Sequence, residues 1–320
     1  MLRIFTIAVL CLAALRAGEP SLKIAYSDWP GWTAWEIAIQ KGWLKEAGIN
    51  AEFVWMEYVP SMEAFQAGKV DAVTVTNGDQ LVMAAAGKDS RGIVVHDYSD
   101  GNDMVIGRPG IASFKDLKGK KVAVEVGFVD HLLLLKALAA NGMQESDITL
   151  VNVPTNDMPQ TLASGDVAAL CAWYPLSGQA LTLVPGSKPL FTSKEVPGLI
   201  YDLTVVDPAS LAKRGAEWQK LTALWPRIVA FINDPKTKDE AVQIMAARVN
   251  VKPEQYALAL PGTKLLDLAG MKKAFTATDG LDSILGSSKT AHAFNLANKV
   301  YDKQLDPAKF LDGTFVQALK

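Results

Sequence analysis

The feature that most constrains the fold is a repeated alternation of short apolar runs with stretches of helical spacing. Residues 21–26, 51–55 and 71–76 read as strands, and turn formers followed by a helical pattern come after each of them. The same alternation restarts at Met104 and continues to Trp173. Strands that alternate with helices favour a mostly parallel sheet covered by those helices. We therefore predict an α/β fold built on two such sheets.

Two segments are predicted to pass between these sheets. Residues 93–98 read as a strand that runs into the turn-rich residues 99–103, and residues 199–206 read as a long strand. Residues 208–320 read as helices that return to the first sheet. We accordingly predict one lobe from residues 22–98 plus 204–320, a second lobe from 99–203, and two hinge crossings between them.

Acidic and aromatic side chains gather where the predicted strands end. Ligands of such sheets bind at the carboxyl ends of the strands, and a cleft between lobes is a common place for a site. Each of these residues also has a structural alternative, because a Trp can pack in a core and an Asp can end a turn or cap a helix. The candidate ligand-binding residues are Asp28, Trp29, Trp32, Asn77, Asp79, Trp173 and Asp202.

Residues 122–135 read as a strand, a tight turn at Gly127 and the start of a helix, with Asp130 at that start. Exposed N–H groups and the macrodipole usually attract an anion to a helix start. An acid there can cap the helix itself, and it then leaves a negative group wherever the turn faces a ligand. Asp130 is therefore an eighth candidate ligand-binding residue. Its alternative interpretation is a plain N-cap.

Charge and targeting signals narrow the class of protein. The 320-residue chain carries a net charge of -2 and has no Lys/Arg stripe, which argues against a nucleic-acid partner. Residues 1–17 read as a signal peptide with Arg3 before an apolar run. We expect a periplasmic protein; a lipid anchor on Cys11 is not favoured, because Leu10 precedes that cysteine where a small residue is usual. No His, Cys or Glu spacing indicates a metal site.

Several motifs, in order, resemble the solute-binding proteins of ABC importers that serve nitrate, taurine and alkanesulfonates. This resemblance implies a two-lobed periplasmic-binding-protein fold of type II, with a mostly parallel sheet in each lobe. It also implies no catalysis, and delivery of a small ligand to an ABC permease in the inner membrane. We further expect no cofactor and a monomer. The motifs are IQKGWLKEAGI (39–49), FQAGKVDA (65–72), FKDLKGKKVAV (114–124), HLLL (131–134), LASGDVAA (162–169) and WYP (173–175).

The chain departs from that group between Gly127 and His131. The resemblance implies small hydroxyl residues there that hold an anion, whereas this chain has Phe128, Val129 and Asp130. An anion about 4 Å from a carboxylate is repelled by roughly 4 kcal/mol at a protein-like dielectric. The other predicted cleft loops are acidic too, and they carry no Arg or Lys.

We therefore predict a small cationic nitrogen ligand, of guanidinium type or an amine, held by carboxylates and Trp faces. The alternative keeps the role with a neutral or anionic ligand: a pyrimidine, urea, nitrate, taurine or an alkanesulfonate. A third interpretation is an enzyme like the thiamin-pyrimidine synthases that share this strand–helix order. Those enzymes carry a cysteine-rich segment, whereas Cys171 is the single cysteine after the predicted signal peptide.

Overall fold

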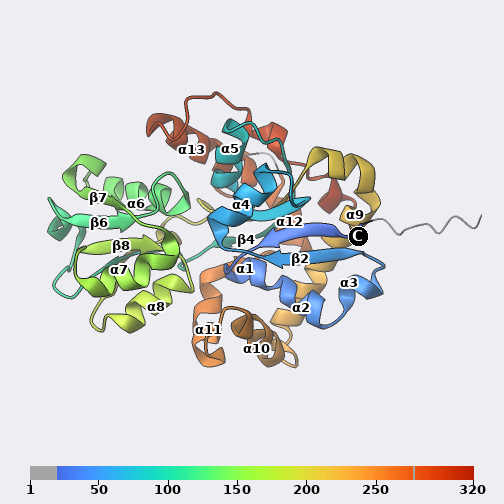
Figure 1. Cartoon of the computed structure of the whole chain (residues 1–320), viewed down its shortest axis with the longest axis horizontal. Helices are drawn as coiled ribbons and strands as arrows, with labels where there is room; N and C mark the ends of the chain where they lie inside the picture. Colours follow the sequence, from blue (N-terminus) through green and yellow to red (C-terminus); the bar gives the residue numbers. More distant parts are fainter. Residues whose placement is uncertain (1–19, 277) are drawn as a thin grey trace, which may run out of the picture.

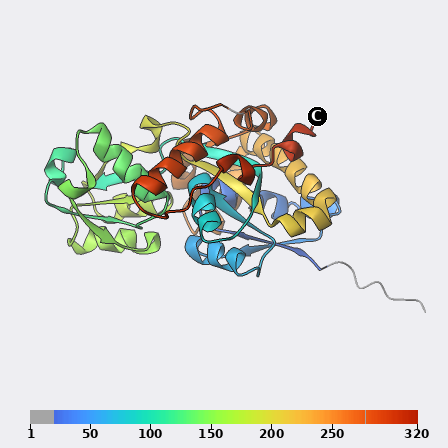
Figure 2. The ribbon, with the colours of Figure 1, turned by 90° about the horizontal axis from the view of Figure 1, so that it is seen from above.

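The computed structural model describes residues 20–276 and 278–320. The predicted signal peptide and Cys11 lie outside them. The described chain forms two sheets, each flanked by helices, and Figures 1 and 2 show them as two lobes side by side. The predicted α/β, two-lobed architecture is confirmed.

The larger sheet has six strands in the order β11-β4-β10-β3-β1-β2. β1, β2 and β3 are parallel, and β10 runs antiparallel between β3 and β4. The carboxyl ends of β1, β3 and β4 and the amino end of β10 therefore meet at one edge. The strands are β1 (Leu22–Tyr26), β2 (Ala51–Trp55), β3 (Ala72–Thr76), β4 (Arg91–Ser99), β10 (Tyr201–Val206) and β11 (Thr263–Leu265).

The smaller sheet has five strands in the order β7-β6-β8-β5-β9. β6 is parallel to β7 and β8, whereas β5 runs antiparallel between β8 and β9. The strands are β5 (Met104–Gly107), β6 (Lys121–Val124), β7 (Thr149–Asn152), β8 (Ala169–Ala172) and β9 (Lys188–Thr192).

Helices cover both faces of each sheet. In Figure 1, α4, α5 and α13 lie on one side of the larger sheet, and α2, α3, α10 and α11 lie on the other. The large-lobe helices are α1 (Pro30–Thr33), α2 (Trp35–Gln40), α3 (Trp43–Glu46), α4 (Tyr58–Gln66), α5 (Asn77–Ala85), α9 (Pro208–Asn233), α10 (Lys238–Arg248), α11 (Pro253–Ala259), α12 (Leu268–Ala274), α13 (Ile284–Ala297) and α14 (Thr314–Gln317). The small lobe has α6 (Val129–Ala140), α7 (Met158–Ser164) and α8 (Leu176–Leu183). Short 3-10 turns lie at Phe114–Leu117, Glu145–Asp147, Thr155–Asp157, Ser193–Glu195, Leu260–Gly262 and Pro307–Phe310.

Three details differ from the sequence-based expectations. The predicted lobe boundary at 203/204 falls inside β10, which belongs wholly to the larger sheet. β11 is a strand within the segment predicted to be helical. The sequence pattern after the first strand predicts one helix from Thr33 to about Ala47, whereas the structure has two, α2 and α3, with Gly42 at a left-handed φ of 71° between them. Among the residues described, no helix is long and apolar enough to cross a membrane.

A buried aromatic cluster packs against one face of the larger sheet. Trp35, Trp218 and Trp225 are fully buried, and Trp35 Nε1 donates to His96 Nε2 on β4 over 3.1 Å. Burial lowers the pKa of His96 to about 3, so this imidazole is neutral at physiological pH. The cluster fixes β4, whose far end reaches the other lobe.

Candidate functional site

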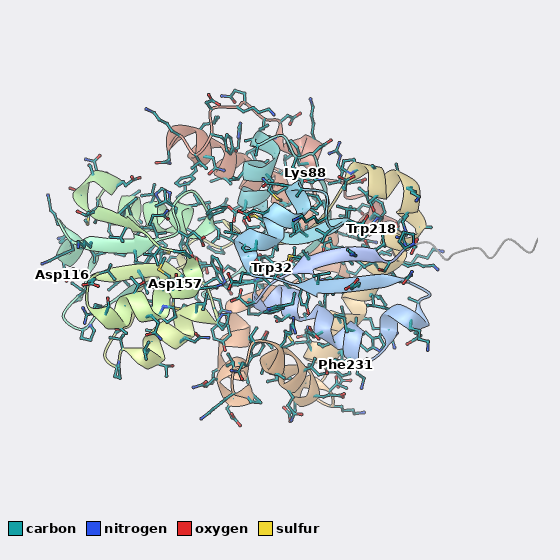
Figure 3. The ribbon with its side chains drawn as sticks, in the orientation of Figure 1. Trp32, Lys88, Asp116, Asp157, Trp218 and Phe231 are labelled. Carbon is teal, nitrogen blue, oxygen red and sulfur yellow. The ribbon has the colours of Figure 1, made fainter. Side chains whose placement is uncertain are left out.

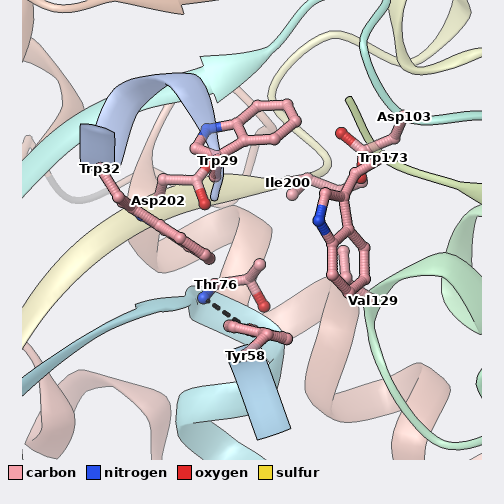
Figure 4. A pocket seen from close by; sticks show the side chains of 9 residues that line it. All are labelled: Trp29, Trp32, Tyr58, Thr76, Asp103, Val129, Trp173, Ile200 and Asp202. Atoms are coloured by element: carbon pink, nitrogen blue, oxygen red, sulfur yellow. Dashed lines mark hydrogen bonds between the residues drawn. The ribbon is translucent and has the colours of Figure 1, made fainter. Parts of the chain in front are cut away.

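A narrow cavity lies where the two lobes meet (Figure 4). About 10 Å³ is open to the centre of a water molecule, which is room for about one water. The cavity is therefore very small. It is lined by Trp29, Trp32, Tyr58, Thr76, Asp103, Val129, Trp173, Ile200 and Asp202.

Strand ends from both lobes deliver these side chains. Trp29 and Trp32 follow β1, and Thr76 ends β3. Asp202 lies at the start of β10, in register with Thr76, because β10 is antiparallel to β3. From the small lobe, Asp103 precedes β5, Val129 begins α6 and Trp173 follows β8. The lining thus combines both lobes, so their approach determines its size.

Aromatic rings form the walls of the cavity. The Trp32 and Tyr58 rings are stacked, with centroids 5.2 Å apart and planes 21° apart. Trp173 reaches across from the small lobe and meets the Tyr58 ring edge-on at 5.3 Å. Its Nε1 also donates to Asp28 Oδ1 of the large lobe over 3.2 Å. Figure 3 shows Trp32 in the middle of the molecule, between the lobes. These contacts hold the lobes together around the cavity.

Trp29 is positioned by Asp97 and by the small size of Gly31. Trp29 Nε1 donates to Asp97 Oδ1 over 2.9 Å. A Cβ added to Gly31 would lie 1.7 Å from Asp97 Oδ2. Glycine is therefore needed for α1 to approach β4 this closely.

Gly31→Ala is accordingly expected to destabilise the protein by about 1–3 kcal/mol, the usual cost of overpacking, and to lower its melting temperature. Gly215→Ala is the matched control, because a Cβ there meets nothing within 4 Å and alanine favours a helix. Thermal unfolding of both variants measures the difference. An equal melting temperature for the two variants would contradict this account of Gly31.

Five buried aspartates gather around the cavity, and we call them the carboxyl cluster: Asp79, Asp97, Asp103, Asp130 and Asp202. The Oδ2 atoms of Asp103, Asp130 and Asp202 accept no hydrogen bond from any described N–H or O–H group. Asp79 differs, because its Oδ2 accepts from Tyr58 OH over 2.7 Å. Buried polar atoms are normally satisfied, so acceptors left over at a cavity indicate a donor that binds there.

Burial raises the pKa of every member of the carboxyl cluster. The pKa of Asp79 and of Asp103 rises to about 7, and that of Asp97 also rises. Burial, and then the Asp97 and Asp103 carboxylates, hold the pKa of Asp202 well above its usual range. Burial and then Asp103 do the same to the pKa of Asp130. Neighbouring carboxyls, rather than cations, are therefore the charges that act on this cluster.

Asp97 and Asp202 face one another across the β4/β10 pairing. A proton on Asp202 allows its carboxyl to donate to Asp97, which raises the pKa of Asp202. Without a ligand, a proton therefore neutralises part of the negative charge of these two carboxyls. A bound cation would neutralise the same charge in its place.

The structure brings together part of the predicted set. Trp29, Trp32, Trp173 and Asp202 line the cavity, whereas Asp28, Asn77, Asp79 and Asp130 are outside its lining. The Asn77 amide is engaged within the large lobe, since Nδ2 donates to Ser287 Oγ (2.9 Å) and Oδ1 accepts from Tyr201 N (3.0 Å). Asp28, next to the cavity, accepts from Trp173 as described above.

The N-cap interpretation of Asp130 is wrong. Phe128 occupies the N-cap position of α6 without a side-chain cap, and Asp130 lies within the first turn. Its Oδ1 accepts from Cys171 Sγ of β8 over 3.5 Å, so the carboxyl points toward the sheet and the cluster. The helix start instead offers the Val129 backbone amide to Asp79 of the other lobe.

Sequence reasoning did not select Tyr58, Thr76, Asp103, Val129 and Ile200 as site residues. The sequence could have indicated Asp103, because this residue lies in the first predicted crossing between the lobes. Tyr58 carried the same signal as Trp29, since it lies three residues after β2, whose carboxyl end shares the edge of β1. Within the described residues, no three His, Cys, Asp or Glu side chains are placed to hold a metal ion.

Comparison with known proteins places this geometry in a family. A Brucella abortus chain named only as a binding protein is 31% identical over 167 residues, and this chain spans about half the length (51%) of that curated relative. A Bacillus subtilis protein named for aliphatic sulfonate binding is 25% identical over 88% of this chain and 83% of its own length.

The solved alkanesulfonate-binding protein of Xanthomonas axonopodis pv. citri, bound to MOPS, superposes with a TM-score of 0.76 at 19% identity, over 93% of this chain and all of that one. This likeness supports the two-lobed fold. The model of the NMT1-like family matches residues 16–246, which is most of the chain. The chain therefore belongs to the NMT1-like family, as its motifs predicted.

Proposed function

We propose that this protein is the solute-binding component of an ABC importer and that it encloses a small ligand in the cavity between its lobes. The family, the two lobes and the shared lining support this role. An ABC permease in the inner membrane as partner, a periplasmic location and a monomeric state are parts of the same proposal. The curated relatives are named as binding proteins, which favours capture over catalysis.

The ligand that suits the chemistry of the cavity lining best is a small cation with several N–H donors, of guanidinium type or an amine. One observation carries this choice: Asp103 of the small lobe and Asp202 of the large lobe both line the cavity with an Oδ2 that no described donor satisfies. Among the described lining residues, none is a lysine or an arginine. A buried carboxylate is costly unless it is paired, so a cation bound between the two would stabilise both.

The aromatic walls suit a flat, delocalised cation. A guanidinium presents planar N–H donors to carboxylates and a face to aromatic rings. The stacked Trp32 and Tyr58 and the Trp173 indole supply such surfaces beside the carboxyls.

The names of the relatives favour the anionic alternative instead, because the Bacillus and Xanthomonas proteins are named for sulfonates. An anion in this cavity would lie beside Asp103 and Asp202, which repel it when ionised, and no lysine or arginine is among the described lining residues to offset that repulsion. The chemistry of the lining is therefore our reason for preferring a cation.

A thermal-shift panel tests the proposal at pH 7.5 and constant ionic strength. The ligands are guanidinium and methylammonium as chlorides, and methanesulfonate, taurine and nitrate as sodium salts or zwitterion, with urea as the neutral member. Millimolar guanidinium is expected to raise the melting temperature, because a ligand at 100 times its Kd stabilises the folded state by about 2.7 kcal/mol.

Sodium chloride at equal concentration is the control for ionic strength, and calcium, magnesium and zinc chlorides cover bare metal ions. A shift with taurine, nitrate or methanesulfonate, and none with guanidinium or methylammonium, would replace the cation with the anionic alternative. Coloured or fluorescent protein with a bound organic cofactor would instead point to the enzyme.

A further inference from the structure

We propose that Ile200 limits the ligand to an unsubstituted small molecule, so that it determines specificity by size. This inference rests on the proposed function only in taking the cavity as the ligand site. The side chain of Ile200 lines the cavity and is 3% exposed. The cavity has room for about one water in this structure, so the lobes must part to admit a solute, and lining side chains that stay in place then limit its size.

The backbone on both sides of Ile200 is held in place. Its carbonyl accepts from Ser99 N over 3.0 Å, which joins the two crossings. Tyr201 N donates to Asn77 Oδ1 (3.0 Å), and Leu199 O accepts from Ser287 Oγ (2.9 Å). Ile200 therefore cannot retreat from a larger ligand as a side chain on a loose loop would.

Val129, the other aliphatic residue among the described lining, differs in this respect. It begins α6 in the small lobe, so it moves with that lobe when the cleft opens. Ile200 lies on the second crossing, between β9 and β10, where movement of the lobes is smallest. A larger ligand could be accommodated at Val129 by incomplete closure, whereas at Ile200 it meets a fixed wall.

The test compares small and enlarged ligands in pairs that share a charge: guanidinium with N-methylguanidinium, and methanesulfonate with ethanesulfonate. Dissociation constants are measured by calorimetry for the unmodified protein, Ile200→Val and Ile200→Ala. The unmodified protein is expected to prefer the smaller member of the pair it binds by about 10-fold or more, as forced overpacking implies. Both variants are expected to reduce that ratio, and Ile200→Ala is expected to reduce it further.

Leu258→Ala is the matched control, because Leu258 is 84% exposed and is not part of the cavity lining. Ile200→Val removes a single methyl group, so it keeps the test valid where the alanine variant fails to fold. Equal affinity of the unmodified protein for both members of a pair, or an unchanged ratio in Ile200→Val and Ile200→Ala, would overturn the size limit alone. If the protein bound only the sulfonates, the proposal of a cationic ligand would be overturned. The ratio of affinities for methanesulfonate and ethanesulfonate would then decide the size limit. Binding of none of the four probes would overturn both.

Discussion

Asp202→Asn is expected to weaken guanidinium binding by at least about 30-fold and, at the same time, to stabilise the ligand-free protein at pH 7.5. Removing one partner of a buried charged hydrogen bond costs about 2–5 kcal/mol of binding free energy. The opposite effect on stability follows from the crowding of carboxyls, because burial and then Asp97 and Asp103 raise the pKa of Asp202 in the folded state.

The sign of the stability change depends on pH. A carboxyl whose folded-state pKa is raised contributes most to stability below its unfolded pKa, and this contribution is lost as pH rises through the folded pKa. Asparagine does not titrate, so its advantage over Asp202 is expected at neutral and higher pH and should vanish near pH 4. Calorimetry for affinity and thermal unfolding for stability measure the two effects separately.

Asp302→Asn, on an exposed residue, is the control for the loss of one negative charge. It is expected to change neither quantity appreciably, since exposed charges far from the site are screened. If Asp202→Asn bound guanidinium as tightly as the unmodified protein does, Asp202 would have no part in holding a cation.

Cation affinity is expected to rise steeply with pH between about 5 and 7. Burial raises the pKa of Asp79 and Asp103 to about 7, so protons occupy part of the carboxyl cluster below that pH. A bound cation favours the ionised carboxyls and releases these protons, which gives up to about tenfold in affinity per pH unit for each proton released. The pKa values of Asp130 and Asp202 are also raised well above their usual range, chiefly by burial, so these carboxyls add to the same trend.

Calorimetry in two buffers of different ionisation enthalpy at pH 6.5 counts the protons released. An anionic ligand predicts the opposite sign, since it would take up protons and bind more tightly as pH falls. His96 does not confuse the result, because its pKa of about 3 keeps it neutral throughout this range. A flat or falling affinity from pH 5 to 7 would therefore contradict the cationic site.

The sequence predicts this site best where it depends on strand ends. Trp29, Trp32 and Trp173 follow predicted strands, and the rule that ligands bind beyond those ends selected them. Asp202 was selected although it begins its strand, because the segment was read as a crossing. The antiparallel pairing that brings it opposite Thr76 is a tertiary fact that no local pattern contains.

Other parts of the site depend on distances that a sequence does not carry. The pairing of β10 with β4 is irregular next to Asp97, since Asp202 pairs with Asp97 but Leu203 pairs with Val95. Such a bulge redirects side chains and has no reliable signature in one sequence. The role of Gly31 is similar, because its glycine looks like part of a Pro-Gly turn until Asp97 is seen against it.

The Trp173 side chain has two roles, and its hydrogen bond to Asp28 connects them. The indole is a wall of the cavity, and through Nε1 it also fastens the small lobe to the large one. A solute that displaces this ring by even a fraction of an ångström therefore weakens the fastening. A badly fitting molecule is therefore expected to leave the two lobes incompletely joined at this hydrogen bond.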